Sequence, residues 1–304
     1  MARIRRRSVP RPTMQTPRWV LEPVDMRSTC GGHAVDTRSC GRTPRPTPPS
    51  PLTRASHVIL RQVNKILLLV AMEAEAMPMV SSLSLTKTEN LIAPPAPCVT
   101  YVSDDGNICL TYYGKCPNTG MCAVGTAPAA LYTYLALQAF EPDLVISTGT
   151  AGGFKSRNAA IGDVFIASKT VNHDRRIAIP GFDEYGVGKL GCVTAPRMRR
   201  DLGLKVGVCS SGNSLDWHDM DMTVMQTHEA AVKEMEAASV AWAASMFGVP
   251  LLAVKAITDI VDGDHPPHEE FLRNLAAAAE ALQDVVPKVV RYIHGRRIGE
   301  LYEV

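Results

Sequence analysis

The chain has 304 residues, of which 46% are hydrophobic and 20% are charged, so it is long enough for one large α/β domain or two small ones. Charge is uneven along it. Residues 1–62 hold twelve Arg, no Lys and three acids and so carry +9, whereas the remaining residues carry −7. A mildly acidic body lacks the broad cationic surface that nucleic-acid binding needs, so we expect no nucleic-acid partner for it.

The first 62 residues are rich in Arg, Pro, Ser and Thr, a composition that disfavours a packed core. We predict a disordered basic leader at residues 1–62 and a functional domain at residues 63–304. The leader has features of an organelle transit peptide, but Glu22, Asp25 and the dense prolines depart from that pattern, and a tail without a targeting role is the other interpretation. We expect a cytoplasmic protein, with a plastid or another organelle as the alternative.

Two further properties limit the function. No apolar run reaches the roughly 18 to 20 residues of a membrane-spanning helix, and the N-terminus lacks the apolar core of a secretory signal, so we expect no membrane partner. The eight cysteines form no close CxxC pair, which indicates a reducing compartment. Cys30, His33 and Cys40 lack a fourth ligand of a zinc site, and we expect neither a metal nor a cofactor.

Ordered structure is predicted to begin at Asn64 with the buried strand KILLLVAM. In chain order there follow a strand at 107–114, a helix at 128–140, strands at 143–149 and 162–171, weaker strands at 204–210 and 231–235, a helix at 237–247 ended by Gly248, a strand at 249–258, and a helix at 269–293 that Pro287 should bend. This alternation predicts an α/β fold with a mostly parallel or mixed sheet between helix layers. Such sheets carry their chemistry at the carboxyl ends of the strands.

Carboxylates mark three predicted junctions between a strand and a helix. Glu73 and Glu75 follow the first strand, Glu234 and Glu236 precede the helix at 237–247, and Asp259 follows the last strand. Any one of them alone could merely cap a helix, which contributes roughly 0.3 to 1 kcal/mol. Their common placement at strand ends makes them candidates for acid–base chemistry.

A glycine-rich segment, STGTAGG at 147–153, follows the strand at 143–149 and is expected to be a loop. Closely spaced glycines let backbone amides approach a ligand or form a tight turn. The segment has neither the GxGxxG spacing of a dinucleotide site nor the Lys-Ser/Thr of a P-loop, so alone it predicts no particular ligand.

In this order, the segments AMEAEAMP, STGTAGGF, IGDVFIAS, HDRR, KEMEAAS and KAITDIVDGD resemble the 5′-methylthioadenosine/S-adenosylhomocysteine nucleosidase family, most closely its plant-type branch. The resemblance covers about residues 63–296 and implies a three-layer α/β/α, nucleoside phosphorylase-like fold with a central mixed sheet. It also implies hydrolysis of the N-glycosidic bond of 5′-methylthioadenosine, with S-adenosylhomocysteine as a second candidate substrate, to yield adenine in methionine salvage.

The resemblance also implies the site residues. As catalytic residues it implies Asp259, which would protonate N7 of adenine from a carboxyl of raised pKa, and Glu75, which would activate water. Glu236 would bind the ribose hydroxyls, and Glu73 and Glu234 would support the site without touching the substrate. The implied substrate-binding residues are Met72, Thr150, Ala151, Gly152, Asn213, Leu215, Trp217, Met235, Glu236 and Thr258.

Two loops depart from the family pattern. Asn213 and Trp217 stand where the plant-type branch has Asp and Met, and the first half of GKCPNTGMCAVGTAP also diverges. Trp217 would narrow the exit for the 5′ substituent, which favours methylthioadenosine over the longer S-adenosylhomocysteine. Family members are homodimers, and HDRRIAIPGFDEYGVG at 173–188 resembles their dimer-facing stretch, although its charged residues could also form a solvated loop.

Three other interpretations stay open. A phosphorylase of the same fold would need an Arg cluster for phosphate, but Ser147 stands where such relatives tend to have an Arg. A catalytically inactive nucleoside-binding relative would not need all three acids. Finally, the basic leader could contact nucleic acid or an anionic membrane, but it lacks aromatic interleaving and amphipathic periodicity.

Overall fold

The structure, a computed structural model, describes residues 59–89 and 91–302. Its elements alternate between strands and helices, as the sequence predicts. In chain order they are β1 (Ile66–Val70), α2 (Glu73–Ser82), β2 (Thr86–Thr88), β3 (Val99–Val102), β4 (Ile108–Tyr112), α3 (Thr126–Phe140), β5 (Leu144–Gly153), η1 (Lys155–Arg157), β6 (Val164–Asn172), α4 (Asp183–Val187), β7 (Leu190–Gly191), α5 (Pro196–Asp201), β8 (Lys205–Ser211), α6 (Asp219–Thr227), β9 (Ala230–Glu234), α7 (Ala237–Phe247), β10 (Leu251–Ile260), α8 (Pro267–Ile293) and η2 (Ile298–Leu301).

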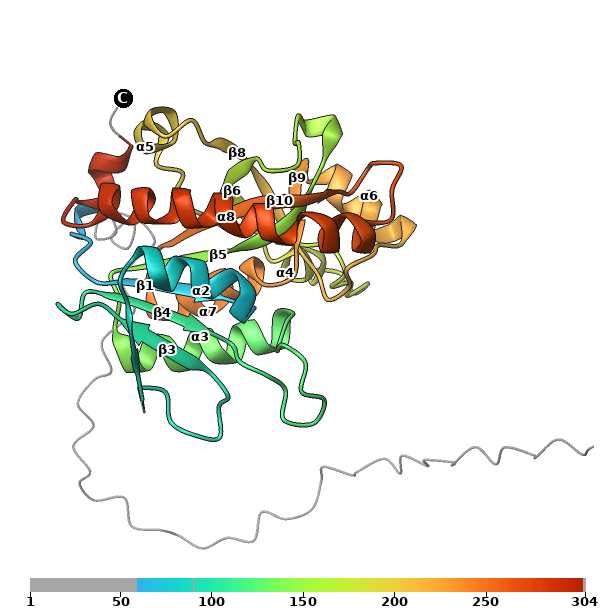
Figure 1. Cartoon of the computed structure of the whole chain (residues 1–304). Helices are drawn as coiled ribbons and strands as arrows, with labels where there is room; N and C mark the ends of the chain where they lie inside the picture. The colour runs from blue at the N-terminus through green and yellow to red at the C-terminus, as the bar shows by residue number, and fades with distance from the viewer. Residues whose placement is uncertain (1–58, 90, 303–304) are drawn as a thin grey trace, which may run out of the picture. The chain divides into compact units, whose positions relative to one another are not determined.

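Strand β1 lies in the middle of the fold and is buried on both faces. Ile66, Leu68 and Val70 belong to one hydrophobic core with residues of α2 and α8, whereas Leu67 and Leu69 belong to a second core with residues of α3 and α7. Successive side chains of a strand point to opposite faces, so a continuous apolar run is what a sheet covered on both sides requires. Figure 1 shows α2 and α8 on the near side of the sheet and α3 and α7 behind it.

The strands form one mixed sheet in the order β10-β6-β8-β9-β5-β1-β4-β3-β2, with β7 paired to β6. This confirms the predicted α/β class with a central mixed sheet. Strand β10 also pairs with β5 in parallel, so β10, β6, β8, β9 and β5 close into a ring. The sequence did not predict this closure, because it depends on which strands become neighbours in space. The short strands β2 and β3 were also not predicted.

The glycine-rich segment at 147–153 is part of a strand and not a loop, which corrects the expectation. β5 continues to Gly153 because β10 pairs with it from Val145 to Gly153 and β9 pairs with Gly152 and Gly153. The absence of side chains permits this crowding: a Cβ on Gly152 would lie 2.7 Å from Asp259 Oδ2. The last strand has the expected ten residues but begins and ends two residues later than predicted, so Asp259 lies within β10 and does not follow it.

Backbone hydrogen bonding to the rest of the domain begins before Asn64, the residue at which the sequence predicts ordered structure to start. Gln62 forms a bridge with Arg297, and the Val63 amide donates to the Arg296 carbonyl at 2.9 Å, which ties this segment to the C-terminal end of the chain. Helix α8 runs through Pro287 without interruption to Ile293, which confirms the predicted helix. The expectations for residues 1–58, including those for Cys30, His33 and Cys40, lie outside the described residues.

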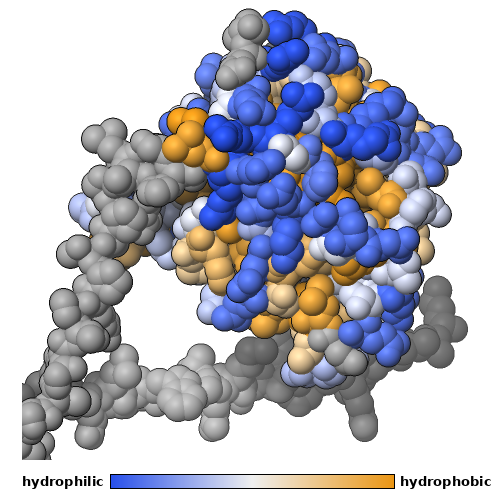
Figure 2. Space-filling view, turned by 90° about the vertical axis from the view of Figure 1, so that its left-hand side faces the viewer, coloured by the Kyte–Doolittle hydropathy of each residue, from blue (hydrophilic) through white to orange (hydrophobic). Residues whose placement is uncertain are grey.

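The functional residues lie at one end of the sheet only. Figure 2 shows the side on which β1 begins, where hydrophilic residues prevail and hydrophobic residues form smaller patches between them. Within residues 59–89 and 91–302, no helix is long and apolar enough to cross a membrane. The functional residues gather at the other end, where β1, β5, β9 and β10 end.

Candidate active site

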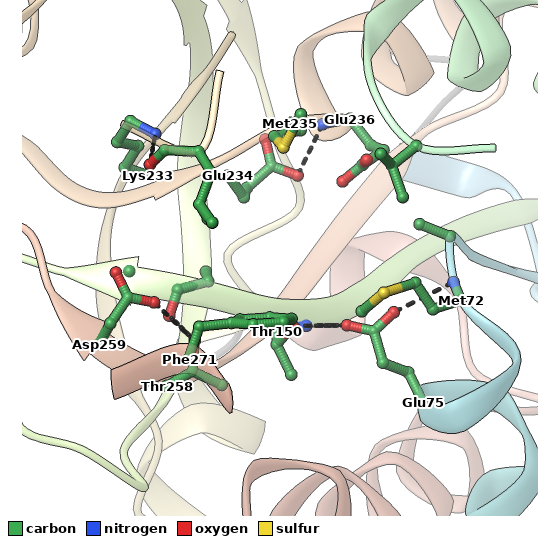
Figure 3. A pocket seen from close by; sticks show the side chains of 15 residues that line it. Met72, Glu75, Thr150, Lys233, Glu234, Met235, Glu236, Thr258, Asp259 and Phe271 are labelled. Atoms are coloured by element: carbon green, nitrogen blue, oxygen red, sulfur yellow. Dashed lines mark hydrogen bonds between the residues drawn. The ribbon is translucent and has the colours of Figure 1, made fainter. Parts of the chain in front are cut away.

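A cavity of about 280 Å³ lies at the carboxyl ends of β1, β5, β9 and β10. The sequence predicts the chemistry at the carboxyl ends of the strands, and the cavity lies there. Figure 3 shows Asp259 and Glu75 on opposite sides of it, with the Met72 sulfur beside Glu75 and the Met235 sulfur beside Glu234 and Glu236. Its lining consists of Ala71, Met72, Glu75, Val124, Thr150, Ala151, Gly152, Leu215, Lys233, Glu234, Met235, Glu236, Thr258, Asp259 and Phe271.

Glu75 is fixed by three donors at the start of α2. Its Oε1 accepts hydrogen bonds from the Thr150 amide at 2.7 Å and the Thr150 hydroxyl at 2.6 Å, and its Oε2 accepts from the Met72 amide at 3.2 Å. Burial raises the pKa of Glu75, and this outweighs the hydrogen bonds from Thr150 and the positive charge of Lys255. A carboxylate held in this way is a stronger base than an exposed Glu.

Asp259 reaches the cavity through an irregularity in β10. Ile257 pairs with Ala151 and Asp259 with Gly152, so Thr258 is the extra residue of a β-bulge. The Thr258 hydroxyl donates to Asp259 Oδ1 at 2.7 Å, and Asp259 Oδ2 lies over Gly152. Burial raises the pKa of Asp259, against the opposing effects of the Thr258 hydroxyl and Lys233. This direction is the one that a proton-donating carboxyl requires.

Glu236 lines the side of the cavity opposite Met72 (Figure 3). Its Oε1 accepts from the Gly125 amide at 2.8 Å. Burial, followed by the neighbouring charge of Glu234, raises the pKa of Glu236 to about 7. Its carboxyl can therefore either donate or accept a hydrogen bond near neutral pH.

Glu234, expected to support the site without touching the substrate, is part of the cavity lining. Its Oε2 forms an ion pair with Lys255 Nζ at 2.9 Å, with both side chains at most 3% exposed. Burial opposes the charge of Glu234, but the ion pair and the Ser211 hydroxyl hold its pKa below the ordinary value. Glu73 lies outside the lining, where its Oε1 accepts from the Tyr112 hydroxyl at 3.4 Å.

Four lining residues were not predicted from the sequence: Ala71, Val124, Lys233 and Phe271. Lys255, which pairs with Glu234 behind the lining, was also not predicted. Lys233 stands inside the quoted KEMEAAS segment and Lys255 inside KAITDIVDGD, so the segments drew attention to the acids and not to the lysines between them. Phe271 belongs to the apolar face of α8, where its position resembles that of any core residue.

Asn213 and Trp217 do not line the cavity, although both were expected to bind substrate. Asn213 Oδ1 instead accepts from the Thr126 amide at 3.0 Å and so satisfies the first turn of α3. Trp217 packs against a core that contains Phe154 and Met225. Of the 213–217 loop only Leu215 lines the cavity. Trp217 therefore takes no part in the lining of this cavity.

The cavity lining contains no Arg, and Lys233 is its cationic residue. Four carboxyl groups share this wall with one ammonium group, which is unfavourable for a bound phosphate dianion. Among the described residues, no three His, Cys, Asp or Glu side chains are grouped to hold a metal ion. An acid and a base facing one buried space suit proton transfer during bond cleavage.

Known proteins match this chain in sequence and in fold. Residues 65–291 match the phosphorylase superfamily. A 5′-methylthioadenosine nucleosidase of Arabidopsis thaliana is 41% identical over 254 residues, covering 83% of this chain and 95% of that protein. A 5′-methylthioadenosine/S-adenosylhomocysteine nucleosidase of the same plant is 41% identical over 246 residues, covering 79% and 96%.

A solved structure agrees with these sequences. The apo form of Arabidopsis thaliana 5′-methylthioadenosine nucleosidase superposes with a TM-score of 0.77 at 41% identity, over 79% of this chain and 100% of that one. The chain belongs to the phosphorylase superfamily and, within it, to the 5′-methylthioadenosine/S-adenosylhomocysteine nucleosidase family.

Proposed function

We propose that this cavity hydrolyses the N-glycosidic bond of 5′-methylthioadenosine to adenine and methylthioribose. The observation that carries the proposal is the pair of buried carboxyl groups, Asp259 and Glu75, that face one small cavity from β10 and α2. Cleavage of this bond builds positive charge on the ribose and negative charge on the base. An acid on the base side and a general base on the ribose side answer those two needs.

Asp259 is the proposed proton donor. Its pKa is raised by burial, so it can hold a proton nearer to neutral pH than an exposed Asp, and its Oδ2 faces the cavity over Gly152. The O–H bond of Asp259 breaks as a bond from the proton to adenine N7 forms, and the electron pair of the glycosidic bond passes to the base. The base leaves as neutral adenine, which is a far better leaving group than its anion.

Glu75 is the proposed base. Water attacks the anomeric carbon of the ribose, and Glu75 takes the water proton, so the sugar leaves as free methylthioribose. Thr150 and Met72 hold both carboxylate oxygens in place, which fixes the base before the substrate arrives. Because Asp259 must be protonated and Glu75 ionised, kcat/KM should have a bell-shaped dependence on pH.

The remaining lining residues fit a nucleoside. Glu236 is the proposed ligand of the ribose hydroxyls, since its Oε1 is already fixed by Gly125 and its carboxyl lies in the lining. Met72 and Met235 supply polarizable apolar surface for the sugar and its thioether, and Leu215 and Phe271 extend that surface. Thr150, Ala151, Gly152 and Thr258 complete the proposed substrate-binding set.

Hydrolysis fits this site better than phosphorolysis does. A phosphorylase binds phosphate as the nucleophile and needs cations to neutralise it. Here the group beside the proposed nucleophile is the Glu75 carboxylate, which repels an anion. The Lys233 ammonium group already donates to two backbone carbonyls. S-adenosylhomocysteine remains a second candidate substrate, because one Arabidopsis relative is named for both compounds.

We also propose a homodimer. Ile179, Phe182 and Tyr185 in the 173–188 stretch expose large hydrophobic side chains at 56%, 48% and 55% of their surface. Such side chains favour burial against another protein surface. For the leader, we propose that it takes no part in catalysis, and that the protein works in the cytoplasm or, if residues 1–62 are a transit peptide, in a plastid or another organelle.

Substitution of the two carboxyl groups in the full-length chain tests the catalytic assignment. Asp259→Asn cannot donate a proton, and Glu75→Gln cannot accept one, so each should lower kcat for adenine release from methylthioadenosine by roughly a hundredfold or more. Circular dichroism and thermal melting check that each variant is folded. A folded Asp259→Asn variant with the wild-type rate would overturn the assignment of the proton donor.

A further inference from the structure

Lys233 occupies a defined place opposite the proposed acid. In the sheet, Gly152 of β5 pairs with Lys233 of β9 on one side and with Asp259 of β10 on the other. Directly paired residues of neighbouring strands point to the same face of the sheet. Lys233 and Asp259 therefore flank a position that has no side chain, and both line the cavity above it (Figure 3).

The ammonium group of Lys233 is held firmly at this place. Lys233 is only 6% exposed, and its Nζ donates to the carbonyl of Ser214 at 2.7 Å and of Leu215 at 2.9 Å. An ammonium group has three donors, so one stays available toward the cavity after these two bonds. Both acceptors are neutral, so the positive charge itself is not cancelled by a direct ion pair among the described residues.

Other charged groups act on Asp259 less directly. Glu234 forms its ion pair with Lys255, and Glu270 of α8 accepts from the Ile260 amide at 2.8 Å. Burial lowers the pKa of Lys233, and Asp259 is the strongest of the negative charges that oppose this. Further charged and titratable groups lie on the elements around Lys233 and Asp259. They are Glu234 on β9, Lys255 on β10, Glu270 on α8, Asp216 and Asp221 near the 213–217 loop, His173 after β6, Glu75 on α2 and Glu236 before α7.

We propose that Lys233 is a positioning residue for the reaction, whose fixed charge stabilises the Asp259 carboxylate that remains after the proton has passed to the base. This inference rests on the proposed function, since it assumes that Asp259 is the acid. No atom of Lys233 is transferred. Its ammonium group keeps its hydrogen bonds to the two carbonyls of the 213–217 loop, and its electrostatic attraction to Asp259 becomes stronger when the Asp259 carboxyl becomes an anion.

Two opposing effects set the pKa of Asp259. Burial and Glu270 raise the pKa of Asp259, whereas Lys233 lowers it and so makes Asp259 a stronger acid. Without the charge of Lys233, Asp259 would hold its proton to higher pH but would release it less readily to adenine. A neutral residue at 233 should therefore lower kcat and, at the same time, extend activity toward alkaline pH. A purely structural role predicts no such displacement.

The test is the pH profile of adenine release from methylthioadenosine by full-length wild type, Lys233→Met, Lys233→Gln, Lys233→Arg and Leu215→Ala. In Lys233→Met and Lys233→Gln we expect the alkaline limb of kcat/KM to move up by on the order of one pH unit, and kcat at the plateau to fall about three- to tenfold. Lys233→Arg should keep the wild-type limb. Leu215→Ala changes the same loop without a change of charge, and should raise KM without moving the limb.

Each outcome bears on one proposal. An alkaline limb that stays in place in both neutral variants, with only KM raised, would show that Lys233 merely holds the loop and would overturn the inference. If Lys233→Met does not fold, Lys233→Gln, which keeps a donor for the carbonyls, decides alone. Wild type that releases no adenine would instead overturn the proposed function, together with this inference. A shifted limb in the neutral variants and an unshifted one in Lys233→Arg supports it.

Discussion

Gly152→Ala is the substitution whose effect follows most directly from the geometry. Gly152 lies on β5 between Lys233 and Asp259, and a Cβ at this position would stand 2.7 Å from Asp259 Oδ2 and 2.7 Å from Val261 Cγ2. Ordinary van der Waals contact begins at 3.4 Å, so these atoms must move by about 0.7 Å. Both neighbours are buried, and Thr258 holds Asp259 from the other side, so the shift cannot be taken up freely.

Two consequences are expected. Overpacking of a buried site costs about 1 to 3 kcal/mol, which urea unfolding should show as a lower midpoint. A misplacement of 1 Å can cost a hundredfold in rate, so a displaced Asp259 should lower kcat for adenine release by on the order of tenfold to a hundredfold. Steady-state kinetics at several pH values separates this loss from a change in the protonation of Asp259.

Gly191→Ala is the matched control, because an added Cβ there would meet no atom within 4 Å. Gly191 belongs to the short strand β7, away from the active-site cavity. We expect unchanged kcat and a midpoint equal to or slightly above that of wild type. If Gly152→Ala kept both the kcat and the stability of wild type, the tight placement of Asp259 over Gly152 would be refuted.

Two further predictions concern buried charges. Lys255→Met leaves the buried Glu234 carboxylate without its partner and should lower the free energy of unfolding in urea by about 3 to 5 kcal/mol. Lys288→Met is the control: it breaks an exposed ion pair and should lower the same quantity by less than about 1 kcal/mol. The pKa of Glu236 is about 7 in the folded chain and 4.5 in the unfolded chain, so between these pH values the folded state keeps a proton that the unfolded state loses. The free energy of unfolding therefore falls as pH rises from 4.5 to 7, by up to about 3 kcal/mol. Glu236→Gln removes this loss, so its melting temperature relative to wild type should be higher at pH 8 than at pH 5; an equal difference at both pH values would contradict the raised pKa.

Much of the fold could be predicted because its elements have clear local patterns. The unbroken apolar run of β1 predicts a strand buried on both faces, and the spacing of apolar residues before Gly248 predicts α7 with its observed ends. The pairing of β10 with both β5 and β6 could not be predicted, since no local pattern encodes which strands meet. That pairing also turns the glycine-rich segment into the end of β5.

The same limit applies to the site. Carboxylates at strand ends indicated the acids, and the structure brings Glu75, Glu236 and Asp259 to one cavity. Lys233 was missed because a lysine in a strand usually points to solvent, and only the pairing of Gly152 with both residues shows that Lys233 and Asp259 flank one position. Asn213 was expected at the substrate because its motif position suggested a loop near the adenine pocket, whereas its amide oxygen accepts a hydrogen bond from the first turn of α3.

The central claim is that this chain is a hydrolase that uses water and two carboxyl groups. The most direct measurement is adenine release from methylthioadenosine by the purified full-length chain, in phosphate-free buffer and with added phosphate, with the sugar product identified by mass spectrometry. The account predicts equal rates in both buffers and free methylthioribose in each. Release that requires phosphate and yields methylthioribose 1-phosphate would contradict it.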